Sequence, residues 1–182
     1  MHIARPTLVL LVVALVAASA AAQSPKALAT TAPDVATGDK AEIARAIDAS
    51  IGWAMTKDRD LLESVIAHDE AFFSFHPDAD STVVGWSNFV PQFDFWMNPA
   101  FKATGYEVRD LRINLSRSGD VAWWSAILDD CGEWQGKPGC WKDTRWTGVL
   151  EKRESRWQIV QMHFSFATPP RKTEPTATPS TM

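Results

Sequence analysis

The sequence lacks the features that several large functional classes require. It has two cysteines, one tyrosine and no tract of basic residues, and its formal net charge is −4 at pH 7. Proteins that bind nucleic acid usually carry clustered lysine and arginine, so we expect no nucleic-acid partner. The chain also lacks a nucleophile motif, a glycine loop that could cradle phosphate and a cluster of metal ligands. We therefore expect no metal and no cofactor.

Long apolar runs are also missing, except near the start of the chain. Met1–Ala22 has the organisation of a secretory signal peptide, with His2 and Arg5 ahead of an apolar run over residues 8–16 and small residues before Gln23. The run is shorter than the roughly 20 residues that span a bilayer. An uncleaved anchor is the alternative. We expect an exported protein, periplasmic or secreted, without stable membrane association after signal cleavage.

The only two cysteines, Cys131 and Cys140, lie close together in sequence. In an exported chain a single closely spaced pair favours a disulfide. Such a bond would fix the register of a hairpin and contribute about 2–3 kcal/mol on the loop-entropy model. Two free thiols are the alternative.

Two segments of biased composition mark the ends of the folded domain. Residues 23–37 are rich in Ala, Thr and Pro, and we expect a flexible linker there. Residues 168–182 are rich in Pro and Thr, and we expect a disordered tail. One domain over residues 38–167 remains, and no internal repeat divides it.

Three segments in the first half of this domain predict helices. Residues 39–56 carry an apolar stripe at helical spacing, and Asp39 is expected to cap this helix in a capping box. Residues 61–67 predict a second, short helix. Residues 86–97 predict a third helix, which Pro91 is expected to kink.

Alternation of apolar and polar residues predicts a sheet. The predicted strands are residues 71–75, 82–84, 104–115, 121–130, 141–152 and 157–166. Helices set against one face of an antiparallel sheet give an α+β architecture. A strongly bent sheet over helices would leave a blind cavity at its open end.

Parity assigns the side chains of these strands to two faces. Pairing Cys131 with Cys140, and joining the last two strands by three residues, sets apolar positions opposite each other. A two-residue turn would swap the faces, and we do not expect it. The predicted inner face is Trp123, Ser125, Ile127, Trp146, Gly148, Leu150, Val160, Met162 and Phe164.

The opposite face would then carry large apolar residues, namely Trp124, Leu128, Trp157 and Ile159. An exposed apolar face of this kind usually has a partner. We expect a homodimer through this outer sheet face. Scattered surface hydrophobic residues are the alternative.

The order of these elements resembles the nuclear-transport-factor-2-like (NTF2-like) superfamily and, within it, the SnoaL-like (polyketide-cyclase-like) domains. Four stretches carry the likeness: Asp58–Ala71, Val84–Trp86, Ser118–Trp123 and Arg156–Ser165. The last stretch is also similar to the end of the association domain of calcium/calmodulin-dependent kinase II. The resemblance implies a cone-shaped fold, with three helices on a strongly curved, mostly antiparallel sheet, an interior pocket and often a dimer.

The resemblance does not settle function, because the superfamily includes isomerases, cyclases, dehydratases, epoxide hydrolases and non-catalytic binders. Steroid-isomerase-like members place an aspartate base at the end of the first short strand, where this chain reads Phe72 to His76. The association domain places an arginine at the position of Phe164, which the resemblance directs into the cavity. No acid–base pair inside the cone is evident.

Four side chains are weak candidates for acid–base chemistry. His76 could lie at the cavity mouth, Tyr106 could donate to an oxyanion, and Asp129 has the parity of the pocket face. His163 has a suitable imidazole, but parity directs it to the outer face. Structural roles are the alternatives, such as an ion pair between Asp129 and Lys142.

Nine tryptophans in one domain suggest an aromatic pocket for a flat apolar ligand, with ordinary core filling as the alternative. The predicted lining is Trp53, Trp86, Trp96, Trp123, Ser125, Ile127, Trp146, Met162 and Phe164. The favoured function is an exported SnoaL-like domain that binds a small hydrophobic molecule. The alternatives are an isomerase, cyclase or hydrolase that uses acid–base residues at the pocket rim, and an interaction domain with a filled pocket.

Overall fold

The computed structural model describes residues 38–78 and 80–168. The predicted signal peptide and linker, and nearly all of the predicted tail, lie outside these residues. None of the helices in the described part of the chain is long and apolar enough to cross a membrane.

The elements follow the predicted order. The helical segments are α1 (Asp39–Gly52), η1 (Trp53–Met55), α2 (Arg59–Val65), α3 (Trp86–Phe89), η2 (Val90–Gln92) and α4 (Phe93–Trp96). The strands are β1 (Phe73–Phe75), β2 (Val83–Val84), β3 (Phe101–Leu115), β4 (Val121–Trp134), β5 (Lys137–Arg153) and β6 (Arg156–Ser165).

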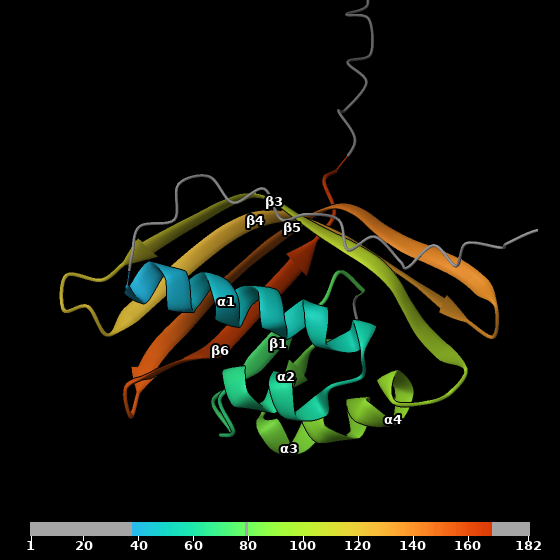
Figure 1. Cartoon of the computed structure of the whole chain (residues 1–182), viewed down its shortest axis with the longest axis horizontal. Helices are drawn as coiled ribbons and strands as arrows, with labels where there is room; N and C mark the ends of the chain where they lie inside the picture. Colours follow the sequence, from blue (N-terminus) through green and yellow to red (C-terminus); the bar gives the residue numbers. More distant parts are fainter. Residues whose placement is uncertain (1–37, 79, 169–182) are drawn as a thin grey trace, which may run out of the picture.

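All six strands form one sheet in the order β2-β1-β6-β5-β4-β3. Every neighbouring pair is antiparallel except β1 and β6, which run parallel. The long strands β3, β4 and β5 arch over α1 and curve toward α4 at one end, so that the helices lie on the concave side (Figure 1). The predicted α+β architecture is confirmed.

The first helix has the predicted apolar stripe but a different start. Ile43 and Ile47 are fully buried, whereas Asp39 makes no cap, because the helix start has no side-chain hydrogen bond. Instead, the Asp39 Oδ1 accepts hydrogen bonds from Lys152 Nζ at 2.7 Å and Trp157 Nε1 at 3.2 Å. The predicted capping box is therefore wrong, and this carboxylate ties the helix to the β5–β6 hairpin.

The third predicted helix is divided into α3, η2 and α4. Pro91 lies in η2 and has no N–H to donate, so the α-helical hydrogen-bond ladder breaks there, as predicted. The resulting turns gather aromatic rings beneath the sheet. Phe93 packs edge-on against Trp53 at 5.6 Å between ring centroids and lies 6.1 Å from Trp96.

A bulge between β4 and β5 changes the predicted faces. The two strands keep the predicted register at Cys131 and Cys140. From Leu128 back to the start of β4, however, each residue pairs one position further along β5 than predicted. Opposite Asp129 the backbone of Asp143 has a φ of 50°, and its N–H donates to the Asp129 Oδ1 at 2.9 Å. The carboxylate thus takes up a donor that the bulge removes from the ladder.

Because a one-residue shift exchanges the two faces of a strand, the predicted inner face of β4 is wrong. Trp124 and Leu128 are buried inside, whereas Trp123 is 46% exposed on the outer face. Ser125 and Ile127 share the face of Trp123. A strict parity count could not find this reversal, because the count assumes an uninterrupted ladder.

The turn and the pairing of the β5–β6 hairpin also differ from the prediction. Arg153 pairs with Arg156 across the two-residue turn Glu154–Ser155, so the three-residue connection that we predicted is wrong. Both turn residues have positive φ, 49° and 67°, as in a type I′ turn that matches the strand twist. Residue Val160 is then left without a partner in the ladder.

The extra residue in β6 explains why two sets of residues share the inner face. Trp157 and Ile159, before the bulge, are buried, and so are Met162 and Phe164 after it. The prediction is right for Met162 and Phe164 and wrong for Val160, which is half-buried. The large residues that suggested a covered outer face therefore belong to the core.

Two tryptophans form the centre of this core. Trp124 packs edge-on against Trp146 at 5.5 Å between ring centroids, and Trp146 stacks on Phe164 at 5.9 Å. Gly148 leaves room for the Trp124 ring, because a Cβ at this position would overlap the indole. The Cys131–Cys140 disulfide is confirmed and joins β4 to β5 near the tip of their hairpin.

Candidate functional site

A cavity of about 650 Å³ lies under the curved end of the sheet. The β4–β5 hairpin extends past the end of α1 and curls toward α4 (Figure 1). The cavity lies between this hairpin and the helical segments. The walls come from the end of α1, η1, α4, the start of β3, the hairpin and the β6 strand. This volume lies within the range of roughly 300–1,000 Å³ that is typical of small-molecule sites.

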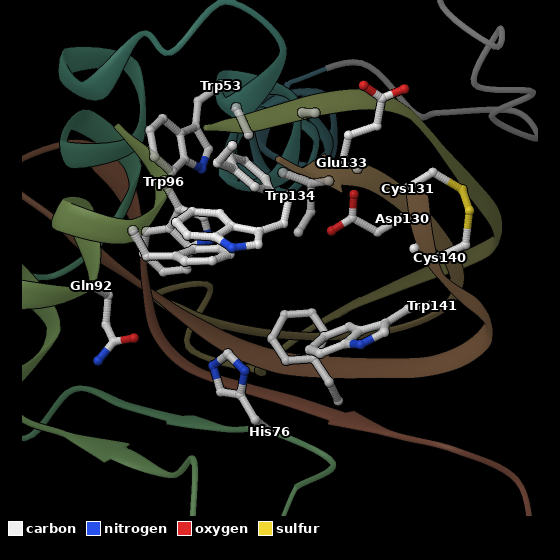
Figure 2. Close-up of a pocket in the computed structure, with 18 of the residues that line it drawn as sticks. Trp53, His76, Gln92, Trp96, Asp130, Cys131, Glu133, Trp134, Cys140 and Trp141 are labelled. Carbon is white, nitrogen blue, oxygen red and sulfur yellow. A yellow bond between two sulfur atoms is a disulfide. The ribbon is translucent and has the colours of Figure 1, made fainter. Parts of the chain in front are cut away.

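Aromatic side chains make up much of the wall. They are Trp53, Phe89, Phe95, Trp96, Phe101, Trp134, Trp141 and Phe164. Figure 2 shows Trp53, Trp96 and Trp134 along one side of the cavity and Trp141 along the other. The rings support one another, since Trp53 meets Trp96 edge-on at 5.7 Å and Phe95 stacks on Trp134 at 5.0 Å. The wall therefore presents a large apolar surface in fixed positions.

Four of the nine residues predicted to line a pocket lie on this wall, namely Trp53, Trp96, Met162 and Phe164. Trp146 is fully buried behind the wall, where it stacks on Phe164. Trp86 stacks on His68 at 3.9 Å outside the cavity. The bulge in the β4–β5 ladder places Trp123, Ser125 and Ile127 on the outer face, so these three assignments are wrong.

Asp130 is the acidic residue of the cavity that parity missed. It pairs with Trp141 of β5 and Tyr106 of β3, and Figure 2 shows its carboxylate directed into the cavity. Loss of solvent raises the pKa of this carboxyl from 3.8 to about 6, against a smaller opposing effect of the Cys131 N–H. The sequence held a signal for it, because one of two successive strand residues, Asp129 or Asp130, must face inward.

His76 lies on the wall next to the end of β1, as predicted for the cavity mouth. Its Nε2 is 3.0 Å from the Ser74 Oγ, and its ring lies 5.4 Å from Phe164 and 6.0 Å from Trp141. Burial lowers the pKa of this imidazole, although the charge of Asp78 opposes the shift. The ring is therefore mainly neutral at pH 7 and approaches the cavity from the side opposite Trp53 (Figure 2).

Asp129 lies outside the cavity, which corrects its predicted place on the pocket face. Lys142 Nζ donates to its Oδ2 at 2.8 Å, and Arg109 Nη2 donates to its Oδ1 at 3.0 Å. The bond from Lys142, then that from the Asp143 N–H, lower the pKa of Asp129 to about 2. The cross-strand ion pair, which we considered as the alternative for this residue, is what the structure shows.

Tyr106 lies outside the cavity, on the inner face of β3. The Tyr106 hydroxyl donates to the Asp48 Oδ1 at 3.0 Å. Burial, followed by the charge of Asp48, raises the pKa of this phenol to about 12. It joins β3 to α1 and has no access to a ligand in the cavity.

His163 lies on the outer face, as parity predicted. Its Nδ1 is 3.5 Å from the Thr147 Oγ1, and its ring lies 5.8 Å from Phe75 of the neighbouring strand. It does not line the cavity.

The remaining polar wall is sparse. Its main members are Ser50, Ser74, Gln92, Glu133 and Lys137. No group of three His, Cys, Asp or Glu side chains in the described residues could hold a metal ion. The chemistry of the cavity therefore depends on an aromatic wall, the carboxyl group of Asp130, which is directed inward, and the imidazole of His76.

Comparisons with solved structures show how widely this fold occurs. An NTF2-like superfamily protein from Salmonella enterica serovar Typhimurium superposes with a TM-score of 0.61 at 18% identity, over 74% of this chain and 96% of that one. An NTF2-like protein from Cytophaga hutchinsonii gives a TM-score of 0.57 at 13% identity, over 70% and 98%. A protein from Xanthomonas campestris, provisionally described as a calcium/calmodulin-dependent protein kinase II association domain, gives 0.59 at 20% identity, over 78% and 96%.

At these identities the structures show a shared fold and nothing about a shared ligand. No curated protein matches the chain in sequence. The family model of the SnoaL-like domain, however, matches residues 43–169, which include all the strands and every residue of the cavity wall. The chain therefore belongs to the SnoaL-like domain family and has the NTF2-like fold, as the sequence resemblance predicted.

Proposed function

We propose that this protein is an exported SnoaL-like domain that binds a small, largely hydrophobic molecule in the aromatic cavity. The observation that carries the proposal is the open volume of about 650 Å³ among the aromatic rings. An interaction domain with a filled pocket would have side chains in this space. Burial of a ligand against these rings would contribute roughly 25 cal/mol for each Å² of apolar surface that leaves water.

Export is supported by two features. The first is the predicted signal peptide, and the second is the Cys131–Cys140 disulfide, since such bonds persist in oxidising compartments. The disulfide closes the hairpin that forms one wall of the cavity. A cavity with a covalently fixed wall suits a compartment outside the reducing cytoplasm.

The proposal is tested by native mass spectrometry of the purified protein, with extraction of any small molecule that remains bound. A direct assay uses the neutral dye N-phenyl-1-naphthylamine, whose fluorescence rises in apolar sites. We expect saturable dye binding. The substitution Trp96→Ala should weaken it at least roughly fivefold, because burial of the dye against one aromatic ring contributes about 1–3 kcal/mol to the binding free energy. The matched control is Trp123→Ala, which removes an indole from the outer face. Equal effects of the two substitutions would exclude the cavity as the dye site.

A second candidate function is proton transfer, because both Asp130 and His76 line the cavity. A carboxyl group with a pKa of about 6 is suited to act as a base or acid near neutral pH. We place it second because no side chain in the described residues hydrogen-bonds to Asp130 to orient it, whereas general bases are usually held by a partner. Turnover of a bound substrate that Asp130→Asn abolishes without loss of affinity would favour the enzyme.

We also propose a homodimer through the outer sheet face, on evidence that differs from the sequence argument. Three large side chains are exposed on this face, Phe73 at 36%, Phe75 at 50% and Trp123 at 46%. Phe73 and Phe75 stand next to Gln161 and His163 of β6, on the face away from the helices. Burial of these rings against a second copy would remove apolar surface from water.

A further inference from the structure

We propose that the cavity selects an organic cation, a small apolar amine or quaternary ammonium compound, whose positive charge lies beside Asp130 within the tryptophan wall. This inference rests on the proposed function, since it names the ligand class of the same cavity. It differs from that function in assigning the ligand a charge. The two can therefore fail separately.

The first observation is that Asp130 has no counter-charge. No lysine, arginine or histidine in residues 38–78 and 80–168 forms an ion pair with it. Its neighbour Asp129 shows the opposite, with Arg109 and Lys142 both within 3.0 Å. A carboxylate that is removed from water and left without a partner is costly, and a cationic ligand would supply the missing charge.

The second observation is the balance of charge around the cavity. Of the lining residues, Asp130 and Glu133 on β4 are acidic, and Lys137 at the hairpin tip is the only lysine or arginine. Lys137 is exposed, so solvent screens its charge. Figure 2 shows the carboxylate of Asp130 directed into the cavity and that of Glu133 directed away from it. The electrostatic potential inside the cavity is therefore negative when Asp130 is ionised.

The other titratable groups near Asp130 do not cancel this potential. On β3, the Tyr106 phenol is committed to Asp48 of α1, and it stays protonated because its pKa is about 12. Beyond the end of β1, His76 is kept mainly neutral by burial, which lowers its pKa. The strand neighbour on β5, Trp141, has no charge. Asp130 is thus the dominant charge inside the cavity above its pKa.

The third observation is the kind of surface that surrounds the carboxylate. Trp53, Trp96, Trp134 and Trp141 all line the same cavity. The face of an indole ring carries partial negative charge and attracts cations, most strongly where water is excluded. Indole faces combined with one carboxylate are suited to alkylammonium groups, whose charge is spread over apolar carbon.

The dependence on pH follows from the carboxyl group. Above about pH 6 Asp130 is ionised and attracts a cation, and below it the protonated acid does not. Affinity for a quaternary ammonium compound should therefore fall as pH drops from 8 to 5. Protonation of His76 would act in the same direction, so the fall must also be measured in His76→Asn, where we expect it to persist.

The test uses two probes of nearly equal shape that differ in charge, the phenyltrimethylammonium ion and tert-butylbenzene. Their dissociation constants are measured with the purified protein by calorimetry and by displacement of N-phenyl-1-naphthylamine. At pH 8 we expect the cation to bind at least roughly tenfold more tightly. In Asp130→Asn this preference should disappear, whereas in Asp94→Asn, the control for an exposed aspartate outside the cavity wall, it should remain.

The possible results separate the two proposals. If the dye binds but the neutral probe binds as tightly as the cation, the cavity function stands and the cation inference is wrong. A preference for the cation that survives Asp130→Asn would overturn the role of this carboxylate. If neither the dye nor either probe binds, the proposed function fails and the inference fails with it. Thermal unfolding of each variant verifies that it is folded.

Discussion

Asp129 and Asp130 are consecutive residues of β4 whose carboxylates lie on opposite faces of the sheet and whose pKa values are shifted in opposite directions. Asp129 is held by Lys142, the Asp143 backbone and Arg109, and its pKa falls to about 2. Asp130 faces the aromatic cavity, and desolvation raises its pKa to about 6. One bulge, stabilised by the first aspartate, decides that the second faces inward.

This pair gives a prediction of opposite sign for two equivalent substitutions. Folded Asp130 keeps its proton up to about pH 6, whereas the unfolded chain loses it near 3.8. The fold therefore loses stability between these two pH values, and the full loss is present above about pH 6. Asp130→Asn should therefore stabilise the protein by about 1–3 kcal/mol at pH 8 and by much less at pH 4. Urea unfolding at the two pH values measures this.

Asp129→Asn should act in the other direction. The lowered pKa of Asp129 stabilises the fold above about pH 4, and this stabilisation is lost as pH falls toward 2. We expect a loss of about 1–2 kcal/mol at pH 8 that shrinks in acid, since the ion pairs are partly exposed to solvent. Equal effects of the two substitutions at pH 8 would contradict the face assignment of β4.

The disulfide should support the cavity as well as the fold. Cys131 and Cys140 lie in the hairpin that also contributes Asp130, Trp134 and Trp141 to the wall. Replacing both cysteines with serine should cost about 2–3 kcal/mol of stability and weaken dye binding. Thermal unfolding and dye titration, repeated on the parent protein with a reducing agent, give the two readouts. Full dye affinity in a folded double variant would show that the hairpin holds its shape without the bond.

Gly148 should be one of the least replaceable glycines in the described chain. A methyl group at this position would overlap the Trp124 ring and the Gln161 carbonyl oxygen, and overpacking of this kind costs about 1–3 kcal/mol or more. Gly148→Ala should lower the unfolding midpoint clearly. Gly105→Ala is the control, because nothing lies within 4 Å of a Cβ there. A neutral Gly148→Ala variant would mean that β4 and β5 pack less closely than described.

The outer face should hold a second copy of the chain. Light scattering after size-exclusion chromatography is expected to give the mass of a dimer at micromolar concentration. Phe75→Glu places a charge among the exposed rings of this face and should yield a monomer, whereas Phe95→Glu, on a residue 46% exposed at the cavity wall, should not. A monomeric parent protein would overturn the dimer proposal.

Much of the fold could be predicted from the sequence because it depends on local patterns. The stripe of Ile43 and Ile47 predicted a helix, the break at Pro91 follows from a missing N–H, and the pairing of Cys131 with Cys140 fixed one point of the register. The inward direction of Phe164 also followed from strand alternation. Each of these inferences needs only the geometry of a single element or a single pair.

The predicted site was less accurate because it relied on alternation along whole strands. The bulge at Asp129 moved Trp123, Ser125 and Ile127 out of the cavity and brought Asp130 into it. The second bulge, at Val160, allowed Trp157 and Phe164 to share a face although their parity differs. A single unpaired residue has almost no signature in composition, yet it moves every side chain that follows it to the opposite face of the sheet.

The amino-acid sequence by itself determined the family, the order of helices and strands and the disulfide, since these follow from local periodicity, turn residues and one closely spaced cysteine pair. Only the tertiary structure decided which aspartate meets the ligand space. That choice depends on where the hydrogen-bond ladder between β4 and β5 is interrupted, and the interruption is stabilised by contacts from Arg109 and Asp143, which are distant in sequence from the residue they redirect.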